Sequence, residues 1–287
     1  MTIRGPAAAS AWAATALLGA VAIAGCGGTA GPPARPGPDD DAPIPLSTTL
    51  LYEPYHAQYR AVSRRHVQQE FNGQVTTTDL NLGYFITARL ASADGALDVT
   101  LILDSIPLLS GLPMADAAQA AGTRFSATMS PSGQVLRFDG DTSQAELVHQ
   151  LATGLKEFFP RLPPNGARLG DTWTDTSEAH TQAGQLDLTV RSVNRHEAVE
   201  WSLWSGERGL RIVTISNYTL SGTGSESGQA YDLDGSGRSH TDQFVGRDGR
   251  FLGLTAVDTL ESTATLTSIG AIIPILQTRT DTLVLVR

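Results

Sequence analysis

The sequence of 287 residues contains one cysteine, Cys26. No disulfide can form within one chain, so the folded part must rely on its hydrophobic core, which a domain of this size can supply. Charged residues make up only 17% of the chain, less than the usual quarter. The formal net charge is −9, so the chain lacks the basic surface of a nucleic-acid-binding protein.

Motifs of common enzyme chemistry are also missing. The sequence has no G-x-S-x-G elbow, no P-loop and no dinucleotide-binding fingerprint. The histidines do not have a metal-ligand spacing such as H-E-x-x-H; they are His56, His66, His149, His180, His196 and His240. We therefore predict a non-enzymatic protein without catalytic residues, cofactor or metal site.

The N-terminus has the pattern of a secretory signal peptide. Arg4 makes the start of the chain positive, residues 11–23 are almost wholly apolar, and the small residues Ala24 and Gly25 follow. The apolar block is shorter than the roughly 20 residues of a membrane-spanning helix. Because Gly, Pro and Ala dominate its edges, a spanning helix is the less favoured alternative.

Ile23-Ala24-Gly25-Cys26 resembles the lipobox of bacterial lipoproteins. The resemblance implies a diacylglycerol on the Cys26 thiol, cleavage before Cys26 and acylation of the new amino group. Several acyl chains, at about 0.8 kcal/mol per buried CH₂, make a stable anchor. The other interpretation is a signal peptide with an incidental cysteine. In the family, the residue after the cysteine sorts the protein, and Gly27 implies no retention at an inner membrane, if the bacterium has two.

The sequence predicts three regions. Residues 1–25 form the signal peptide. Residues 26–46 hold the lipidated Cys26 and a Pro, Gly and Asp tether that cannot bury enough apolar surface to fold. Residues 47–287 form one β-rich domain. We expect this domain outside the cytoplasm, anchored to a membrane of the cell envelope.

Period-two alternation of apolar and polar residues dominates the domain. It predicts strands at 59–70, 80–90, 97–104, 186–193, 199–204, 210–220, 251–266 and 276–286. Ala93-Asp94-Gly95 predicts a hairpin turn, and a second hairpin spans 124–139. The fold class is therefore mainly β, with long antiparallel strands in a curved sheet or barrel-like fold.

One amphipathic helix is predicted beside the sheet. Ser143 and Glu146 form a capping box, Leu147, Leu151, Leu155 and Phe158 follow at helical spacing, and Pro160 ends the pattern. A weaker helical pattern covers residues 115–121.

The segment FFPRLPPNGARLGDTWT, residues 158–174, resembles a pattern of uncharacterised bacterial lipoproteins, in which "LP" precedes "GDTW". SGTGSESGQAYDLDGSG and GRDGRFLG resemble the same group. The resemblance implies an extracytoplasmic β-rich domain and no known activity. Gly170 would permit a turn, Asp171 would accept a backbone hydrogen bond there, and Trp173 would anchor the core, with ligand contact as the alternative.

Three further segments allow two interpretations each. Asp232, Asp234 and Ser236 have the spacing of a calcium loop, but Gln243 stands where the loop needs Glu, which favours a polar strand or turn. Arg64-Arg65-His66 is interpreted as a solvated strand face, with an anion site as the alternative. The apolar segment 269–276 predicts a buried loop or strand, or else the lip of a cavity or partner surface.

These patterns favour a binding or carrier module for an apolar ligand or a lipidated partner. The alternative is a structural or assembly role in the envelope. The expected partners are the membrane, through the N-terminal lipid, and an apolar ligand or an envelope protein.

Overall fold

The computed structural model describes residues 45, 47–110, 118–139, 146–155, 157–183, 185–226 and 228–286. The signal peptide, Cys26, almost all of the predicted tether and Ser143 of the capping box lie outside these residues. The elements are β1 (Tyr55–Phe71), β2 (Gln74–Ala93), β3 (Ala96–Ser110), β4 (Arg124–Met129), β5 (Val135–Asp139), α2 (Glu146–Leu155), β6 (Thr172–Ala183), β7 (Leu186–Trp204), β8 (Glu207–Glu226), β9 (Gln229–Gly246), β10 (Phe251–Leu266) and β11 (Ala271–Val286).

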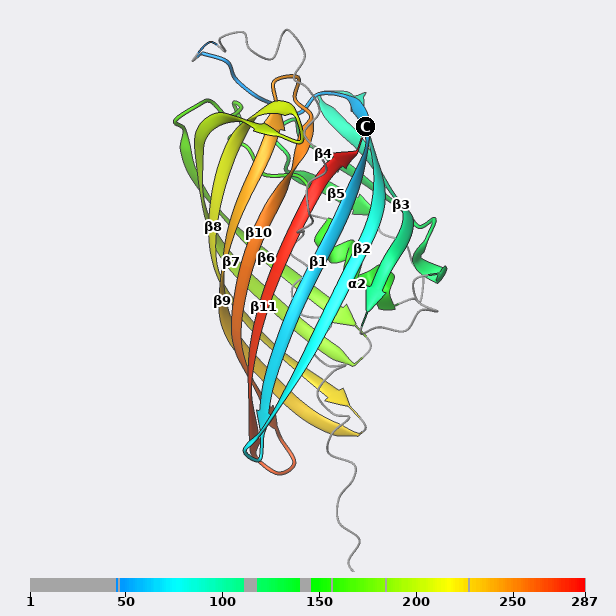
Figure 1. The fold of residues 1–287 in the computed structure, drawn as a ribbon, viewed down its shortest axis with the longest axis vertical. Helices are drawn as coiled ribbons and strands as arrows, with labels where there is room; N and C mark the ends of the chain where they lie inside the picture. The colour runs from blue at the N-terminus through cyan, green and yellow to red at the C-terminus, as the bar shows by residue number, and fades with distance from the viewer. Residues whose placement is uncertain are drawn as a thin grey trace, which may run out of the picture.

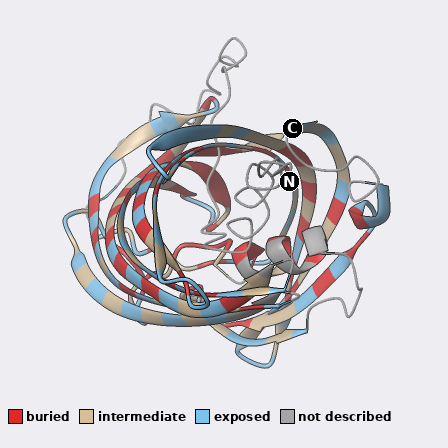
Figure 2. Ribbon diagram, turned by 90° about the horizontal axis from the view of Figure 1, so that it is seen from below, coloured by how far each residue is buried: buried red, intermediate tan, exposed pale blue. Residues whose placement is uncertain are grey.

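All eleven strands belong to one antiparallel sheet in the order β5-β4-β3-β2-β1-β11-β10-β9-β8-β7-β6. Strands β1 to β5 form one meander, strands β6 to β11 form a second, and the two meet where β1 pairs with β11. The sheet is strongly curved but open, with β5 and β6 at its edges, and α2 lies on its concave side (Figures 1 and 2). The predicted fold class is confirmed, as a curved sheet.

Tight turns explain how strands of this length follow one another so closely. Asn72-Gly73, Asp94-Gly95 and Ser205-Gly206 each join two strands, and all six residues have positive φ angles between 39° and 85°. Two successive residues in the left-handed backbone conformation give a turn that matches the twist of the two flanking strands, and Gly adopts this conformation without steric cost. The predicted Asp94-Gly95 turn is confirmed, and so is the hairpin of β4 and β5.

Alternation along each strand separates a concave from a convex face. On β1 the side chains of Tyr59, Ala61 and Val67 are buried, whereas Arg60 and Arg64 between them are exposed. The predicted strands 186–193 and 199–204 form one strand, β7. A bulge between Ala198 and Glu200 shifts its register, so the alternation changes phase there and the sequence shows two runs.

Helix α2 places an apolar stripe against the sheet. Val148, Leu151 and Leu155 are buried in the same cluster as Tyr59. The helix ends at Leu155, earlier than the pattern predicts, because the Glu157 amide donates to the Gly154 carbonyl in a tighter turn. Phe158 is still buried, just beyond the helix. Of the weaker helical pattern, residues 118–120 are helical and 115–117 lie outside the described residues.

The described ranges contain no helix with the length and apolar character needed to cross a membrane.

Two apolar clusters occupy the concave face at its two ends. The upper cluster surrounds α2 and includes edge-to-face contacts of Phe158 with Tyr59 and with Phe251, at centroid distances of 5.3 and 5.8 Å. The lower cluster includes Leu188, Tyr218, Leu220, Tyr231 and Leu260. Between the clusters the concave wall is polar.

Candidate functional site

A band of polar side chains crosses the concave face between the two apolar clusters. Its residues are strand neighbours in one register row, so they point to the same side of the sheet. We call this row the polar belt; from β6 to β1 it consists of Asp175, Asn194, Ser216, Ser239, Asp258, Arg279 and Arg65. Buried polar groups are costly unless they are hydrogen-bonded, so the contacts of the belt decide what it can do.

Tyr218 and Asp258 form the central contact of the belt. The Tyr218 hydroxyl lies 3.0 and 2.9 Å from the two carboxylate oxygens of Asp258, to which it donates. Tyr218 belongs to β8 and Asp258 to β10, so the ring crosses the intervening strand β9. It crosses at Gly237, its register partner, where an added Cβ would lie 2.2 Å from the ring. Glycine at this position is therefore what lets the ring reach Asp258.

Charges within the belt balance one another. Arg279 Nε lies 2.6 Å from Asp281 Oδ2, and both side chains are buried. Burial and, to a smaller extent, the charge of Arg279 lower the pKa of Arg65 to about 10, although Asp281 and Asp258 oppose the shift. Burial also raises the pKa of Asp258, against the hydrogen bond from Tyr218 and the charge of Arg279. Two arginines face two aspartates here, so this part of the wall has no excess of either sign.

Gln277 lies one register row below Arg279 and is fully buried. Neither its amide nitrogen nor its amide oxygen has a hydrogen-bond partner among the described residues. An unsatisfied buried polar group costs about 1–3 kcal/mol. The side chain therefore offers a donor and an acceptor, side by side, to a water molecule or to a polar group of a ligand.

A second polar group lies where the belt approaches edge strand β6. His196 is buried; its Nδ1 lies 2.8 Å from Thr214 Oγ1 and its Nε2 lies 3.5 Å from Asp175 Oδ2. Burial raises the pKa of Asp175, but hydrogen bonds with His196 and Asn194 outweigh burial, so the pKa lies below its ordinary value.

These residue types could suggest a relay of acid, base and nucleophile, but their contacts favour a structural role. Thr214 is buried and its hydroxyl donates to Gln243 Oε1 at 3.2 Å. The Trp173 ring stacks on the His196 ring at 5.0 Å between centroids.

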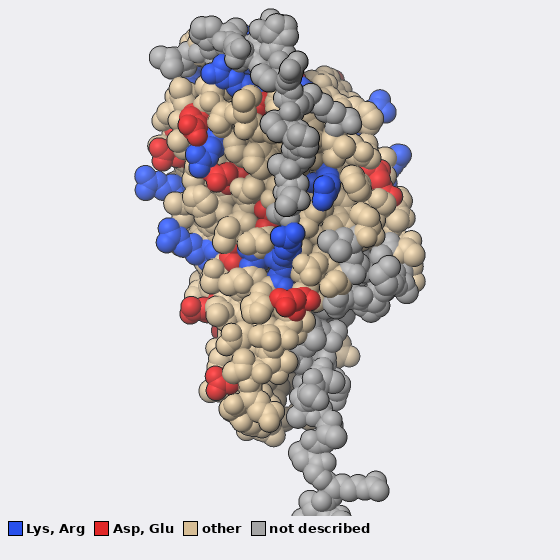
Figure 3. All heavy atoms as spheres, viewed as in Figure 1, with Lys and Arg blue, Asp and Glu red and all other residues tan. Residues whose placement is uncertain are grey.

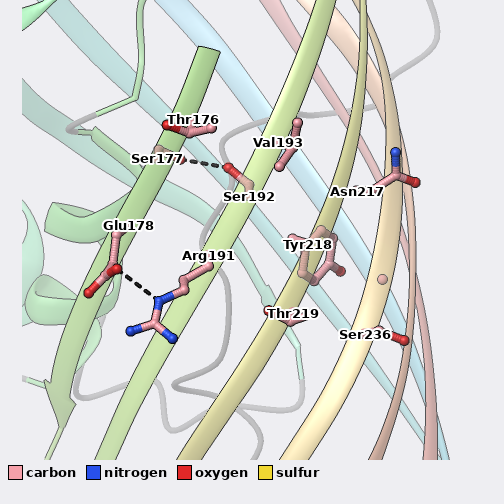
Figure 4. A pocket seen from close by; sticks show the side chains of 11 residues that line it. Thr176, Ser177, Glu178, Arg191, Ser192, Val193, Asn217, Tyr218, Thr219 and Ser236 are labelled. Atoms are coloured by element: carbon pink, nitrogen blue, oxygen red, sulfur yellow. Dashed lines mark hydrogen bonds and ion pairs between the residues drawn. The ribbon is translucent and has the colours of Figure 1, made fainter. Parts of the chain in front are cut away.

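A cavity of about 710 Å³ extends over four neighbouring strands, β6 to β9. Most of its lining side chains lie on the exposed, convex face of the sheet, among them Glu178, Arg191 and Val193. Ser177, Ser192, Tyr218 and Gly237 form the register row between these outward side chains. Figure 4 shows the Ser177 and Ser192 side chains pointing toward each other, 2.7 Å apart at their hydroxyls. The cavity is therefore an open groove on the outer surface of the sheet. On the opposite, concave face the row below Ser192 and Tyr218 contains Val190 and Leu220 of the lower apolar cluster, so the polar and apolar parts of the concave wall meet there.

The GDTW segment has the predicted structural contacts. Gly170 has a φ of 86°, and the Asp171 carboxylate accepts a hydrogen bond from the Arg168 amide at 2.9 Å. The Trp173 ring packs against the upper cluster, and its indole nitrogen donates to the Arg161 carbonyl at 3.0 Å. These contacts explain how the turn enters β6.

The remaining sequence-predicted residues lie in strands or turns. Asp232 and Asp234 are exposed on β9, a continuous strand, so the calcium-loop alternative is wrong and the polar strand is confirmed. No group of three or more His, Cys, Asp or Glu side chains in the described part of the chain could hold a metal ion. Arg64 and His66 are exposed, but the interpretation of Arg65 as solvated is wrong, because alternation turns its side chain to the concave face.

The segment 269–276 is only partly buried. Ile275 is buried, but Ile269 and Ile272 are 68% and 63% exposed, so a wholly buried strand is the wrong interpretation. Residues 267–270 form the turn between β10 and β11, and the rest of the segment belongs to β11.

Comparison with known proteins gives no family for this chain. No protein-family model matches it, and no curated protein matches it. Solved structures that align with it include an engineered protein described for asymmetric conductivity (12% identity, 80% of this chain and all of the other, TM-score 0.25). A mutant porin of Rh. blastica aligns with 10% identity over 80% of this chain and all of the porin, with a TM-score of 0.23. A DUF1329 family protein from Desulfovibrio piger has 9% identity over 81% and 85% of the two chains, with a TM-score of 0.15. TM-scores this low identify neither fold nor function.

Proposed function

We propose that this protein is a lipid-anchored, non-catalytic protein of the bacterial envelope that binds an amphiphilic ligand on the concave face of its sheet. The observation that carries the proposal is the buried amide of Gln277 on the concave face, which has no hydrogen-bond partner among the described residues and lies beside Leu260 and Ile275 of the lower apolar cluster. A ligand with a polar head and an apolar chain would satisfy both the amide and the apolar side chains.

The charge and shape of the wall narrow the chemistry of the head group. The charged groups of Arg65, Arg279, Asp258 and Asp281 offset one another, which favours a neutral head over an ion. Ser177 and Ser192 can each donate or accept a hydrogen bond. The upper part of the concavity is filled by α2 and the aromatic rings of the upper cluster, so the ligand would lie in the lower part.

The anchor rests on the lipobox resemblance. A chain with Cys26→Ser should move from the membrane fraction to the soluble fraction or stay unprocessed, and mass spectrometry should show no acylated N-terminus. If the variant remains acylated, the lipobox interpretation is wrong.

The ligand proposal is tested by native mass spectrometry of the Cys26→Ser chain purified without its signal peptide. We expect an additional mass that organic solvent extracts as an amphiphile. Ser192→Phe, which places a ring on the concave face in the register row of Gln277, should abolish the additional mass. Thr174→Phe on the exposed face of β6 is the matched control and should retain it. A wild-type chain without bound amphiphile, but with a stoichiometric protein partner, would instead support an assembly role.

A further inference from the structure

Two neighbouring hairpins at the end of the sheet opposite the start of β1 have exposed apolar side chains and no charged residue near their turns. The turn Asn72-Gly73 of the β1–β2 hairpin and the turn 267–270 of the β10–β11 hairpin lie side by side at this end (Figure 1). We call the exposed apolar side chains there the apolar tip: Val75, Ile269, Ile272 and Leu276, which are 56%, 68%, 63% and 39% exposed.

The apolar tip differs from the rest of the surface in charge. Residues 71–78 and 262–278 contain no Asp, Glu, Lys or Arg, although the whole chain has a net charge of −9. In Figure 3 the charged side chains lie over the middle and upper parts of the molecule, and few lie near this end. Two uncharged hairpins can approach a surface of anionic lipids without the repulsion that the acidic body would meet.

We propose that the apolar tip inserts into the interfacial layer of a lipid bilayer, as a second membrane contact beside the lipid anchor. Threonine flanks the apolar side chains on both hairpins, and serine also does so on the second; such uncharged polar groups can lie among lipid headgroups. Exposed apolar patches of this kind mark protein or membrane contacts, and each apolar side chain transferred from water favours the contact.

The predicted anchor makes the bilayer the available partner, so this part of the inference rests on the proposed function. The tether runs for nineteen residues from Cys26 to Pro45, and about 3.1 Å per residue in an extended proline-rich chain gives about 60 Å. Strand β1 has 17 residues, and about 3.3 Å per residue gives about 56 Å. A tether attached before β1 is therefore long enough for the tip to reach the bilayer that holds the anchor.

The experiment uses the Cys26→Ser chain purified without its signal peptide, which lacks the acyl anchor, and vesicles of phosphatidylethanolamine and phosphatidylglycerol. We expect the chain to float with the vesicles, and Ile269→Asp with Ile272→Asp to lower the partition coefficient about tenfold or more. Leu136→Asp with Leu203→Asp is the matched control, because these leucines are 59% and 60% exposed on other strands. Equal loss in both double variants, or no flotation of the parent chain, would overturn the proposal.

A fluorescent label reports whether the tip itself enters the lipid. Because Cys26 is the only cysteine, Val75→Cys in the Cys26→Ser background has a single thiol for a bimane label. Its emission should shift to the blue with vesicles, whereas the same label at Leu136→Cys should not shift. A blue shift that appears without vesicles and rises with protein concentration would show that a second copy of the chain covers the tip, and would overturn the proposal.

Failure here is distinguishable from failure of the ligand proposal. Ser192→Phe should keep vesicle binding while it loses the bound amphiphile, and the Ile269 and Ile272 double variant should show the reverse.

Discussion

The ring of Tyr218 lies over Gly237, and its hydroxyl reaches the Asp258 carboxylate two strands away. This contact ties β8 to β10 across β9, in addition to the backbone ladder. It also places an aromatic ring on the concave face, at the boundary between the polar belt and the lower apolar cluster.

Gly237→Ala should destabilise the fold by about 1–3 kcal/mol, because the new methyl group overlaps the Tyr218 ring. In the Tyr218→Ala background the same substitution should cost clearly less, since the ring is gone. Urea unfolding of the two single variants and the double variant gives the coupling energy. Additive effects would mean that the ring does not depend on glycine at this position.

Tyr218→Phe removes only the hydroxyl and should cost about 1.5–3 kcal/mol, the range for a hydrogen bond to a charged group. The hydroxyl stabilises the ionised carboxylate, so its loss should raise the pKa of Asp258 further above its ordinary value. NMR titration of the Asp258 carboxyl carbon measures this shift. An unchanged pKa would show that the hydroxyl does not stabilise the ionised form.

The lowered pKa of Asp175 predicts how the stability of the fold depends on pH. Its pKa in the folded chain lies below 3.8, so its carboxylate stabilises the fold above about pH 3.8, and this contribution is lost as the pH falls through the folded pKa. Asp175→Asn should therefore destabilise by about 1 kcal/mol at pH 6, and the difference from wild type should shrink near pH 3. Thermal unfolding of both chains at pH 6 and pH 3 measures this difference in stability. If the difference does not change with pH, the carboxylate of Asp175 does not stabilise the fold in its ionised form.

Leu151→Ala in α2 should cost about 2–5 kcal/mol, because the side chain is 8% exposed within the upper cluster. Leu136→Ala makes the same chemical change on β5, where the side chain is 59% exposed, and should cost less than about 0.5 kcal/mol. If denaturant midpoints are unchanged for both, α2 is a loose cover and not part of the core.

Trp173→Ala should cost about 3 kcal/mol, since the ring packs on the upper cluster and on His196. Trp173→Phe keeps a ring but loses the hydrogen bond to the Arg161 carbonyl, and should cost about 1 kcal/mol. A stable Trp173→Ala chain that no longer retains its amphiphile would instead assign this side chain to the ligand site.

Period-two alternation was sufficient to predict most strands, because one face of each strand is buried and the other is solvated. The strand at 251–266 and the Asp94-Gly95 turn agree with the structure. The pattern was insufficient at β9, where Gly235 and Gly237 occupy concave positions. Glycine there makes room for side chains of neighbouring strands, so the apolar atoms that would reveal the strand belong to Tyr218 and other partners.

The polar belt could have been found in part. In the sequence of β11, Gln277, Arg279 and Asp281 alternate with threonine in the same phase as the apolar Ile275 and Leu283. Polar residues at the alternate positions whose other members are buried and apolar indicate that part of the interior is polar. Which of them meet, however, depends on strand order: Arg65 and Arg279 are neighbours only because β1 pairs with β11, and no local pattern specifies that pairing.

The pairing of β1 with β11 also governs how the chain can fold. Each remaining strand pair joins strands that are consecutive in the chain, so both meanders can assemble from short-range contacts as synthesis proceeds. The β1–β11 ladder, by contrast, joins residues such as Gln58 and Val286, and contacts so distant in sequence form slowly because the loop entropy must be lost first. Until the last strand is made, both meanders expose an unpaired edge that can aggregate. A chain with this order of strands therefore depends on its C-terminal residues to complete the sheet, and loss of β11 would leave two half-sheets.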